Sequence, residues 1–265
     1  MVQSRWTNQW LVCNVYAVSS PSQIAVIVPC HNEATTIAAL VGEIKKHLPH
    51  VIVIDDGSTD ETSRLARSGG AEIIRNDAAQ GKGAALRAGW KRAMELGFQW
   101  ALTMDGDGQH SPGDIPKFLN ALERAPLVIG NRMFEQDKIP RLRRMVNRWM
   151  SKRLSTVAGR ELPDTQCGFR LINLKAWSGL NLQTTHFEIE SELLLAFIAA
   201  GYHVEFIPIE VIYKNERSKI RPWQDTIRWF RWFRNLRTLN ARFSPCPHCA
   251  EKPTVSANPV SVKHV

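Results

Sequence analysis

Long apolar runs are absent from this sequence of 265 residues. No stretch approaches the roughly 18–20 apolar residues that a transmembrane helix needs. The longest apolar run, LLLAFIAAGY from Leu193, is better explained as the end of a buried helix. The first 20 residues are partly apolar but are broken by Asn and Gln, without a clear signal-peptide pattern. We therefore expect no membrane-spanning segment in this sequence.

Cysteine is scarce, and its count is odd. An odd number at irregular spacing does not indicate a disulfide framework, so a reducing compartment is the simpler expectation. The pair Cys246 and Cys249 has a metal-like spacing, but no second ligand pair lies nearby, which favours a loose tail over a zinc site. The five cysteines are Cys13, Cys30, Cys167, Cys246 and Cys249.

The glycine fingerprint of dinucleotide-binding proteins is also missing. No Gly-x-Gly-x-x-Gly follows the first predicted strand, which argues against a Rossmann dehydrogenase. What the chain does have is 44% apolar residues, enough for one sizeable α/β domain, and a net charge of +9. The positive charge suggests an anionic partner, such as a nucleic acid, an anionic membrane surface or a phosphorylated substrate.

Strand and helix patterns alternate through the first half of the chain. Apolar, β-branched runs predict strands at about 23–29, 51–54, 71–75, 100–104 and 125–133. Helical spacing predicts helices at 34–47 and 81–96, and Ser58 with Glu61 has the spacing of a capping box before a further helix. This alternation predicts an α/β fold with a mostly parallel central sheet flanked by helices.

Polar residues recur where these strands end. They follow the first strand at 29–33, the second at Asp55 and Asp56, and the fourth at 105–109. Ligands of open α/β sheets bind outside the carboxyl ends of the strands, so these segments are candidates for one shared site.

The segment LTMDGDGQH leads a buried strand into two carboxylates. Gly106 and Gly108 permit a backbone bend that lets Asp105 and Asp107 converge. Converging carboxylates repel unless a cation lies between them, and a hard divalent ion such as Mg²⁺ fits oxygen ligands. The alternative is a pair of turn aspartates that cap the following helix.

The second half of the chain is less regular. We expect a loop leading into a strand at 163–173, a helix at 187–201, a strand at 203–213 and a basic, aromatic helix at 221–243. The predicted organisation is an N-terminal extension (1–22), one domain (23–215), a basic amphipathic helix (216–243) and a disordered tail (244–265).

Six short segments occur together in one order: VPCHNE, DDGSTDET, GKGAALRAG, DGDGQH, GNR and DTQCGFR. Together they resemble the family 2 glycosyltransferases, in particular the dolichol-phosphate mannosyltransferase-like, polyprenyl-phosphate branch, over residues 23–213. The resemblance implies a nucleotide-sugar-binding GT-A fold. It also implies transfer of a sugar, with inversion, from a nucleoside diphosphate sugar with the help of Mg²⁺ or Mn²⁺.

The same resemblance implies site residues. The nucleotide-sugar-binding set is Pro29, His31, Glu33, Ile54, Asp55, Asp56, Lys82, Asp105 and Gly106. The metal ligands are Asp105, Asp107 and Gln109, with His110 bracing the turn rather than binding the ion. The catalytic set is Asp107, Arg132 and Glu190. For Lys82 the competing interpretation is a solvated lysine at the start of a helix. For Glu188 and Glu190 it is an acid at a helix N-terminus that only complements the macrodipole.

The acceptor side rests on the segment DTQCGFR. Asp164, Gln166, Arg170 and the later Lys219 are the implied acceptor-binding residues. A lipid phosphate is already anionic, so Glu190 would then orient the acceptor rather than deprotonate it. Tyr213 stands where the family pattern suggests an arginine, which puts the exact acceptor contacts in doubt. The processive signature Gln-x-x-Arg-Trp is missing, which indicates transfer of a single sugar.

The last predicted helix carries Trp229, Trp232, Phe233 and Leu236 on one stripe with arginines around it. Such a stripe suits the surface of an anionic membrane, or alternatively packs on the domain. No nucleic-acid-binding fold accompanies it. We expect a glycosyltransferase on the cytoplasmic face of a membrane that moves one hexose from a UDP- or GDP-sugar to a polyprenyl phosphate. The rivals are a soluble or other non-phosphate acceptor, or a nucleotide-sugar- or lipid-binding protein without turnover.

Overall fold

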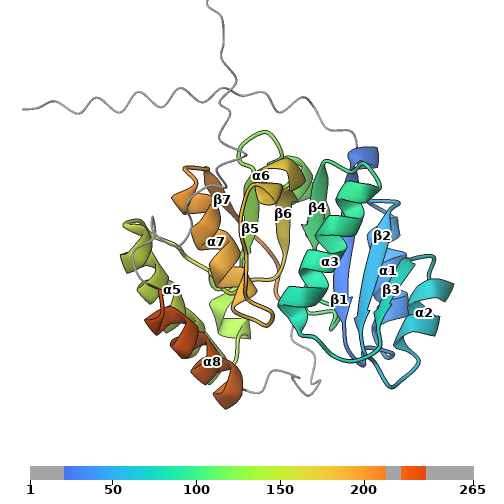
Figure 1. Cartoon of the computed structure of the whole chain (residues 1–265), viewed down its shortest axis with the longest axis horizontal. Helices are drawn as coiled ribbons and strands as arrows, with labels where there is room; N and C mark the ends of the chain where they lie inside the picture. The colour runs from blue at the N-terminus through green and yellow to red at the C-terminus, as the bar shows by residue number, and fades with distance from the viewer. Residues whose placement is uncertain (1–20, 213–221, 237–265) are drawn as a thin grey trace, which may run out of the picture.

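A seven-stranded sheet forms the centre of the protein in the computed structural model, which describes residues 21–212 and 222–236 (Figure 1). The strands are β1 (Ile24–Cys30), β2 (Val51–Asp56), β3 (Glu72–Asn76), β4 (Trp100–Thr103), β5 (Leu127–Asn131), β6 (Arg170–Asn173) and β7 (Val204–Pro208). Their order is β3-β2-β1-β4-β6-β5-β7. Only β6 runs antiparallel to its neighbours β4 and β5, so the predicted mostly parallel sheet is confirmed.

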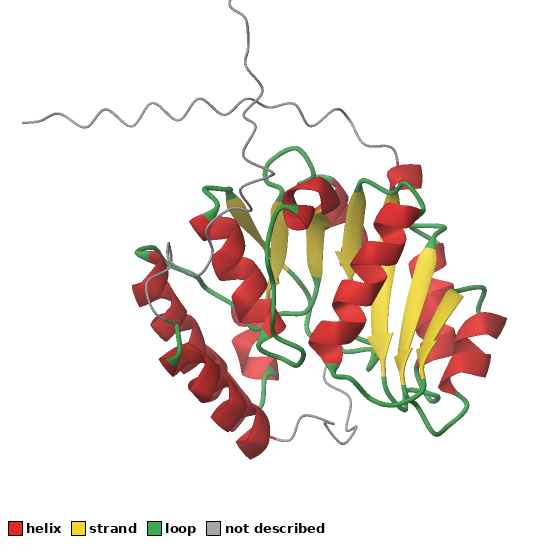
Figure 2. Ribbon diagram, in the orientation of Figure 1, coloured by secondary structure: helices red, strands yellow, loops and turns green. Residues whose placement is uncertain are grey.

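Helices cover both faces of the sheet (Figure 2). They are α1 (Ile37–Lys45), α2 (Thr62–Ser68), α3 (Lys82–Glu95), α4 (Ile115–Leu119), α5 (Arg141–Ala158), α6 (Leu174–Ser178), α7 (Ile189–Ala199) and α8 (Pro222–Arg234). Three short 3₁₀ helices, η1 (Pro21–Gln23), η2 (Pro112–Asp114) and η3 (Arg132–Lys138), complete the described elements. None of the helices in residues 21–212 and 222–236 is both long and apolar enough to cross a membrane.

The core includes buried side chains of α1, α3, α4 and α7 as well as those of the central strands. Strands β2 and β4 are buried throughout, as the apolar runs at their starts predict for inner strands of a parallel sheet. Helix α3 packs closely on β1 at Gly89, where an added Cβ would lie 2.3 Å from the side chain of Ile27. This close approach fixes the position of the α3 N-terminus at the edge of the sheet.

One local expectation, the capping box before α2, is wrong. Ser58 and Glu61 do not form a capping box, because α2 begins at Thr62 and neither side chain caps it. The Ser58 hydroxyl instead accepts a hydrogen bond from the backbone N–H of Asn32, which ties together the loops after β1 and β2.

Helix α5 is absent from the elements that we expected, although its 18 residues make it the longest of the described helices. Two signals could have identified it. Pro140 lies just before it, and Gly159, with φ of 65°, ends it in the left-handed conformation. The segment between them has a strong basic charge, which hides the apolar spacing of Met150 and Leu154 on its buried side.

Candidate active site

One edge of the sheet gathers the polar residues that the sequence singled out. The carboxyl ends of β1, β2, β4 and β5 lie there, as expected for parallel strands. Because β6 runs the opposite way, its beginning rather than its end reaches the same edge. The loop 164–169 therefore joins the site, and this contribution depends on strand direction.

Lys82 connects two of the predicted site carboxylates. Its Nζ lies 2.6 Å from Asp105 Oδ1 and 2.6 Å from Glu190 Oε1. Burial alone would lower the pKa of Lys82, but the two carboxylates outweigh burial and raise its pKa. Burial alone would raise the pKa of Asp105, yet Lys82, and then His110, hold that pKa well below its usual range. Lys82 and Asp105 therefore form an ionised pair, and the Glu190 carboxyl group lies on the other side of the ammonium group.

The N-terminus of α3 holds Lys82 in this position. Gly81, with φ of 101°, turns the chain into the helix, and a side chain there would strike the carbonyl oxygen of Thr185. The backbone N–H groups of Gly83 and Ala84 donate to the same carbonyl oxygen, at 2.8 and 3.1 Å. The loop that carries Thr185 thus covers the start of α3, and its Phe187 ring lies 5.4 Å from the Lys82 Nζ.

The Asp107 carboxylate is half-buried and lies near that of Asp105. Burial raises the pKa of Asp107, and the negative charge of Asp105 raises it further. Asp107 Oδ1 also accepts a hydrogen bond from the backbone N–H of Gln109, at 3.0 Å, and Gln109 Oε1 accepts one from Arg143, at 3.2 Å. Arg143 belongs to α5 and was not among the expected site residues.

This pair of carboxylates fits a divalent cation of the Mg²⁺ type. Its donors are oxygens, and the repulsion between Asp105 and Asp107 is what a bound cation relieves. In the described part of the chain, no three His, Cys, Asp or Glu side chains cluster as a metal site. A cation here would be held by the two carboxylates, with the Gln109 side-chain oxygen as the predicted third protein ligand. A diphosphate and water would supply the remaining ligands, which is the usual mode of Mg²⁺ binding.

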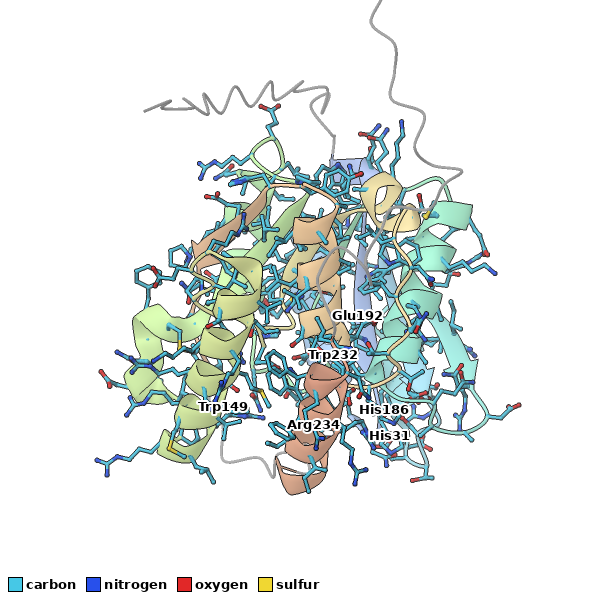
Figure 3. The ribbon with its side chains drawn as sticks, turned by 60° about the vertical axis from the view of Figure 1, so that its left-hand side comes forward. His31, Trp149, His186, Glu192, Trp232 and Arg234 are labelled. Carbon is cyan, nitrogen blue, oxygen red and sulfur yellow. The ribbon has the colours of Figure 1, made fainter. Side chains whose placement is uncertain are left out.

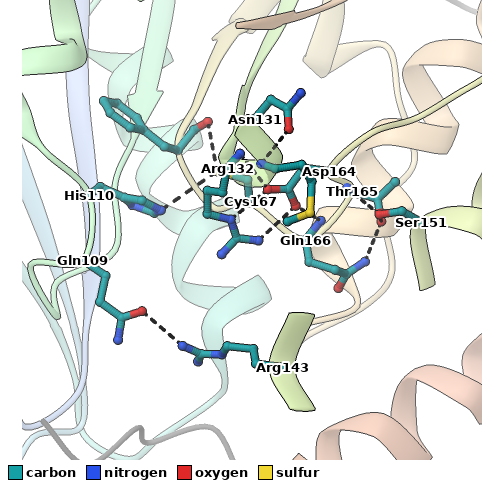
Figure 4. A network of polar contacts seen from close by, with 12 residues as sticks. Gln109, His110, Asn131, Arg132, Arg143, Ser151, Asp164, Thr165, Gln166 and Cys167 are labelled. Atoms are coloured by element: carbon teal, nitrogen blue, oxygen red, sulfur yellow. Dashed lines mark hydrogen bonds and ion pairs between the residues drawn. The ribbon is translucent and has the colours of Figure 1, made fainter. Parts of the chain in front are cut away.

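Arg132 and Asp164 form a two-pronged ion pair (Figure 4). Arg132 Nε and Nη2 donate to the two carboxylate oxygens at 2.8 and 2.9 Å, and the Arg132 backbone N–H donates to one of them at 3.1 Å. Burial alone would raise the pKa of Asp164, but Arg132 outweighs it and lowers that pKa. Asp164 is fully buried, so it orients Arg132 and does not itself face the open edge.

The other predicted acceptor residues differ in their surroundings. The Gln166 side chain donates to the hydroxyl groups of Thr165 and Ser191, at 2.9 and 3.0 Å. Arg170 is 2% exposed, and its guanidinium donates to three backbone carbonyls, those of Cys167, Glu190 and Thr165. Arg170 therefore holds the backbone of the loop 164–169 and of Glu190 and is not available to an acceptor, whereas Gln166 is partly exposed. Lys219 and Tyr213 lie outside the described residues.

The predicted nucleotide-binding loops meet at the ends of β1 and β2. His31 Nδ1 lies 2.8 Å from the carbonyl oxygen of Asp56, and the imidazole is exposed. The Asp56 carboxylate accepts hydrogen bonds from the backbone N–H groups of Gln80 and Gly81, both at 2.8 Å, so it holds the segment that leads to Lys82. In Figure 3 His31 and His186 lie at the same edge of the molecule.

Four of the remaining predicted residues line or support that corner. Pro29 is half-buried, and Glu33 is 9% exposed and lies in the loop after β1. Asp55 and Ile54 are fully buried, and Asp55 accepts a hydrogen bond from Ser58 N–H at 2.8 Å. The Ile54 side chain packs toward α3, so only its backbone can face a ligand.

The turn between the two aspartates is braced from beneath. The carbonyl oxygen of Gly106 accepts a hydrogen bond from Thr36 Oγ1 at 2.7 Å. His110 is buried against Phe169, and burial lowers its pKa to about 4. Its Nδ1 lies 3.4 Å from the Asp105 backbone nitrogen. These contacts agree with the prediction that His110 braces the turn.

Gly168, which sequence reasoning passed over, limits the space for Asp105. A Cβ at Gly168 would lie 2.7 Å from both carboxylate oxygens of Asp105. The motif DTQCGFR contained this glycine, but only the fold brings it against the aspartate.

Gly168→Ala is expected to displace the Asp105 carboxylate and to weaken Mn²⁺-dependent binding of a nucleoside diphosphate. The affinity for the nucleoside diphosphate in Mn²⁺ should fall about tenfold, because over-packing costs roughly 1–3 kcal/mol. The control is Gly42→Ala in α1, where an added Cβ meets nothing within 4 Å. Isothermal titration with and without Mn²⁺ measures the effect. Unchanged Mn²⁺-dependent binding in Gly168→Ala would show that Asp105 does not need its present position.

Several known proteins are similar to this chain in fold or in sequence. The glucosyl-3-phosphoglycerate synthase of Mycobacterium tuberculosis, solved with Mn²⁺, uridine diphosphate and glucosyl-3-phosphoglycerate, superposes with a TM-score of 0.63 at 18% identity, over 82% of this chain and 81% of that one. The undecaprenyl-phosphate mannosyltransferase of Micrococcus luteus is 30% identical over 58% of this chain and 64% of its own length. The UDP-N-acetylglucosamine–dolichyl-phosphate N-acetylglucosaminyltransferase of Methanococcus voltae is 28% identical over 72% of this chain and 86% of its own length.

The mixed sheet, with its polar carboxyl edge, is the GT-A fold, and the protein is a glycosyltransferase. The model of glycosyl transferase family 2 matches residues 25–178, more than half of the chain. The chain belongs to this family, as the six segments in the sequence predicted.

Proposed function

We propose that this protein transfers a single hexose, with inversion, from a UDP- or GDP-sugar to a polyprenyl phosphate or a related lipid. The observation that carries the proposal is the row of charged groups at the carboxyl edge, which lies beside the amphipathic pair α5 and α8. A water-soluble donor and a membrane-bound acceptor can both reach such an edge. The relatives from Micrococcus luteus and Methanococcus voltae, whose names specify polyprenyl acceptors, support the choice of acceptor.

The donor end of the site is the corner between β1, β2 and β4. His31 and Glu33 would contact the nucleoside, since they lie in the loop above Asp56. Lys82 would contribute its ammonium group to the donor phosphates, because it lies beside Asp105 at the start of α3. The first backbone N–H groups of this helix already bind the Thr185 carbonyl oxygen. Asp105 and Asp107 would hold Mg²⁺ or Mn²⁺, which supplies charge neutralisation for the departing nucleoside diphosphate. The Mycobacterium tuberculosis protein with Mn²⁺ and uridine diphosphate supports this choice of ion.

The acceptor end lies between Arg132, Gln166 and Glu190. Asp164 holds the Arg132 guanidinium in one orientation, and a guanidinium fork suits an incoming phosphate. A phosphate monoester is already a nucleophile, so Glu190 need not take a proton from it. Its pairing with Lys82 favours an orienting role.

The predicted membrane face of α8 needs correction. Trp229 and Trp232 are 2% and 7% exposed and pack into the domain, so they do not form a free membrane-binding stripe. The exposed apolar side chains belong to the opposite side of the helix pair. Those of α5 are Leu142, Met145 and Trp149, and those of α8 are Ile227 and Phe230.

The helices α5 and α8 join these side chains into one surface, because the rings of Trp149 and Phe230 stack at 6.4 Å. Helix α5 contains six basic and no acidic residues, and Arg153 lies over the Trp149 ring at 5.5 Å. Apolar side chains surrounded by arginine and lysine are typical of helices that lie on an anionic bilayer. We propose that this surface contacts the membrane that carries the acceptor.

The paired change Leu142→Ser with Phe230→Ser is expected to release the protein from anionic vesicles. The two side chains are 63% and 44% exposed, so their loss should not unfold the domain. With serine at both positions, less apolar surface enters the bilayer. The constant for partitioning onto vesicles should fall at least about tenfold, since each buried apolar side chain contributes roughly 1.5–3 kcal/mol.

The matched control is Met94→Ser with Leu96→Ser, two exposed apolar residues at the end of α3. Co-sedimentation with vesicles that contain phosphatidylserine measures the partitioning. Equal partitioning of the test and control variants would contradict the assignment of the surface to α5 and α8.

A transfer assay tests the function itself. UDP- and GDP-sugars labelled in the hexose are offered with undecaprenyl phosphate in vesicles, with Mn²⁺ or with EDTA. We expect a labelled lipid with one hexose per phosphate, formed only with the cation and inverted at the anomeric carbon. Transfer to glycerate phosphate instead would favour a soluble acceptor, and nucleotide binding with no transfer to either would favour a binding protein.

A further inference from the structure

Helix α8 is linked to α7, beside the candidate acceptor loop, by a hydrogen bond from a buried indole. Trp229 Nε1 donates to Ser191 Oγ at 2.9 Å. Ser191 is fully buried and directly follows Glu190 on α7. The same hydroxyl oxygen accepts a second hydrogen bond, from Gln166 Nε2 at 3.0 Å. A single oxygen atom thus joins α8, α7 and the loop 164–169.

The chain of contacts continues to α5. Gln166 Nε2 also donates to Thr165 Oγ1 at 2.9 Å, and this hydroxyl lies 3.1 Å from Ser151 Oγ of α5 (Figure 4). The Thr165 backbone N–H donates to the same Ser151 hydroxyl, at 3.1 Å. Both helices of the amphipathic pair therefore hold the loop that supplies Asp164 and Gln166.

The Trp229 ring is itself fixed by packing. It stacks on Phe233 at 5.0 Å with an interplanar angle of 8°, and meets the edge of Trp149 at 5.6 Å. Its indole N–H is therefore held in one direction by rings from both helices. A second link between α8 and α7, Arg228 to Glu188 at 3.9 Å, is longer, and the Arg228 side chain is 43% exposed. The buried indole is the better-defined connection.

We infer that Trp229 is a positioning residue: its N–H fixes Ser191, and through Ser191 the Gln166 side chain and the loop 164–167 at the acceptor end of the site. The acceptor part of this inference rests on the proposed function. The packing of α8 on the domain then sets the acceptor end directly. The donor corner is connected to it less directly, through Glu190, which pairs with Lys82, and Gly168, which lies against Asp105. This difference gives the inference a measurable signature.

The test compares Trp229→Phe with Trp232→Phe in the full-length protein. Both changes replace a largely buried indole by a phenyl ring on the same helix. In the described part of the chain, Trp232 Nε1 has no hydrogen-bond partner, whereas Trp229 Nε1 has Ser191. The pair therefore separates the loss of the hydrogen bond from the loss of ring area.

Hydrogen–deuterium exchange at residues 164–167 is the first measurement, because it does not depend on turnover. We expect exchange about three- to tenfold faster in Trp229→Phe, the factor that corresponds to loss of one buried hydrogen bond, and no change in Trp232→Phe. Ser191→Ala should have at least the same effect, because it removes the hydrogen bonds from both Trp229 and Gln166. Adding Trp229→Phe to Ser191→Ala should then change the exchange little further, because the Trp229 hydrogen bond is already lost. Equal exchange in the two Trp variants would overturn the inference.

Kinetics supply the second measurement. In Trp229→Phe the KM for the lipid acceptor is expected to rise roughly three- to tenfold, with smaller changes in the donor KM and the nucleotide affinity. A similar rise in Trp232→Phe, or an unchanged acceptor KM in Trp229→Phe, would overturn the role in acceptor positioning. If the wild-type protein transfers no sugar to lipid, the proposed function fails, and the exchange measurement still decides whether Trp229 holds the loop.

Discussion

Asp107→Ala is expected to reduce cation-dependent sugar transfer at least about 1,000-fold, because the diphosphate then departs without a properly held counter-charge. The fold should survive, since the Asp107 carboxylate is half-buried and its hydrogen bond, from the backbone N–H of Gln109, lies within the same turn. Two measurements check this expectation. Steady-state transfer rates in Mn²⁺ give the loss of activity, and thermal melting reports the fold.

The control for this variant is Asp77→Ala. Asp77 is an exposed carboxylate just beyond β3 at the same edge of the sheet, so it tests the effect of removing any negative charge there. Asp77→Ala should keep wild-type activity. If Asp107→Ala retains cation-dependent transfer near the wild-type rate, Asp107 does not bind the ion and the proposed metal site is wrong.

Lys82→Met is expected to lower transfer at least about 100-fold, the scale observed when one preorganised donor to developing charge is removed. Two physical effects combine. The diphosphate loses a cation at a helix N-terminus, and the buried Glu190 carboxylate loses the ammonium group 2.6 Å away. Nucleoside diphosphate affinity, measured by titration, should fall together with the rate, and the melting temperature should also fall.

Two further variants separate these effects. Lys91→Met removes an exposed lysine from the same helix and should change neither affinity nor melting temperature. The double variant Lys82→Met with Glu190→Gln removes the unpaired buried charge, so it should recover the melting temperature but not the affinity. An undiminished nucleotide affinity in Lys82→Met would assign Lys82 to structure alone.

The sequence allowed much of the fold and the donor corner to be predicted. All seven strands were predicted in approximately correct positions. Apolar β-branched runs gave the first five, and buried inner strands of a parallel sheet favour such runs. The last two were predicted from a loop that leads into a strand and from an alternating pattern. Asp105 and Lys82 were identified from short motifs at strand ends and helix starts, and the structure brings them into contact. Local chemistry was sufficient there, since each motif encodes its own turn.

Predictions from the sequence were less accurate for side chains whose contacts come from distant segments. Trp229 and Trp232 have the spacing of a membrane-binding stripe, and periodicity cannot distinguish a stripe that faces lipid from one that packs on α5 and α7. Arg170 has the residue type for an acceptor phosphate, yet three carbonyl oxygens occupy its guanidinium. In both cases the outcome depends on what the neighbouring element offers.

By itself, then, the sequence determined the class of fold, the family and the residues at the edge of the sheet, because these depend on patterns and motifs within short segments. Only the tertiary structure decided which of those residues are exposed at that edge. It also decided that Asp164 orients Arg132 and that Trp229 of α8 donates a hydrogen bond to Ser191. The physical reason is that burial and hydrogen bonding depend on which two segments come into contact. Here those contacts depend on the antiparallel direction of β6 and on the packing of α8 against α5.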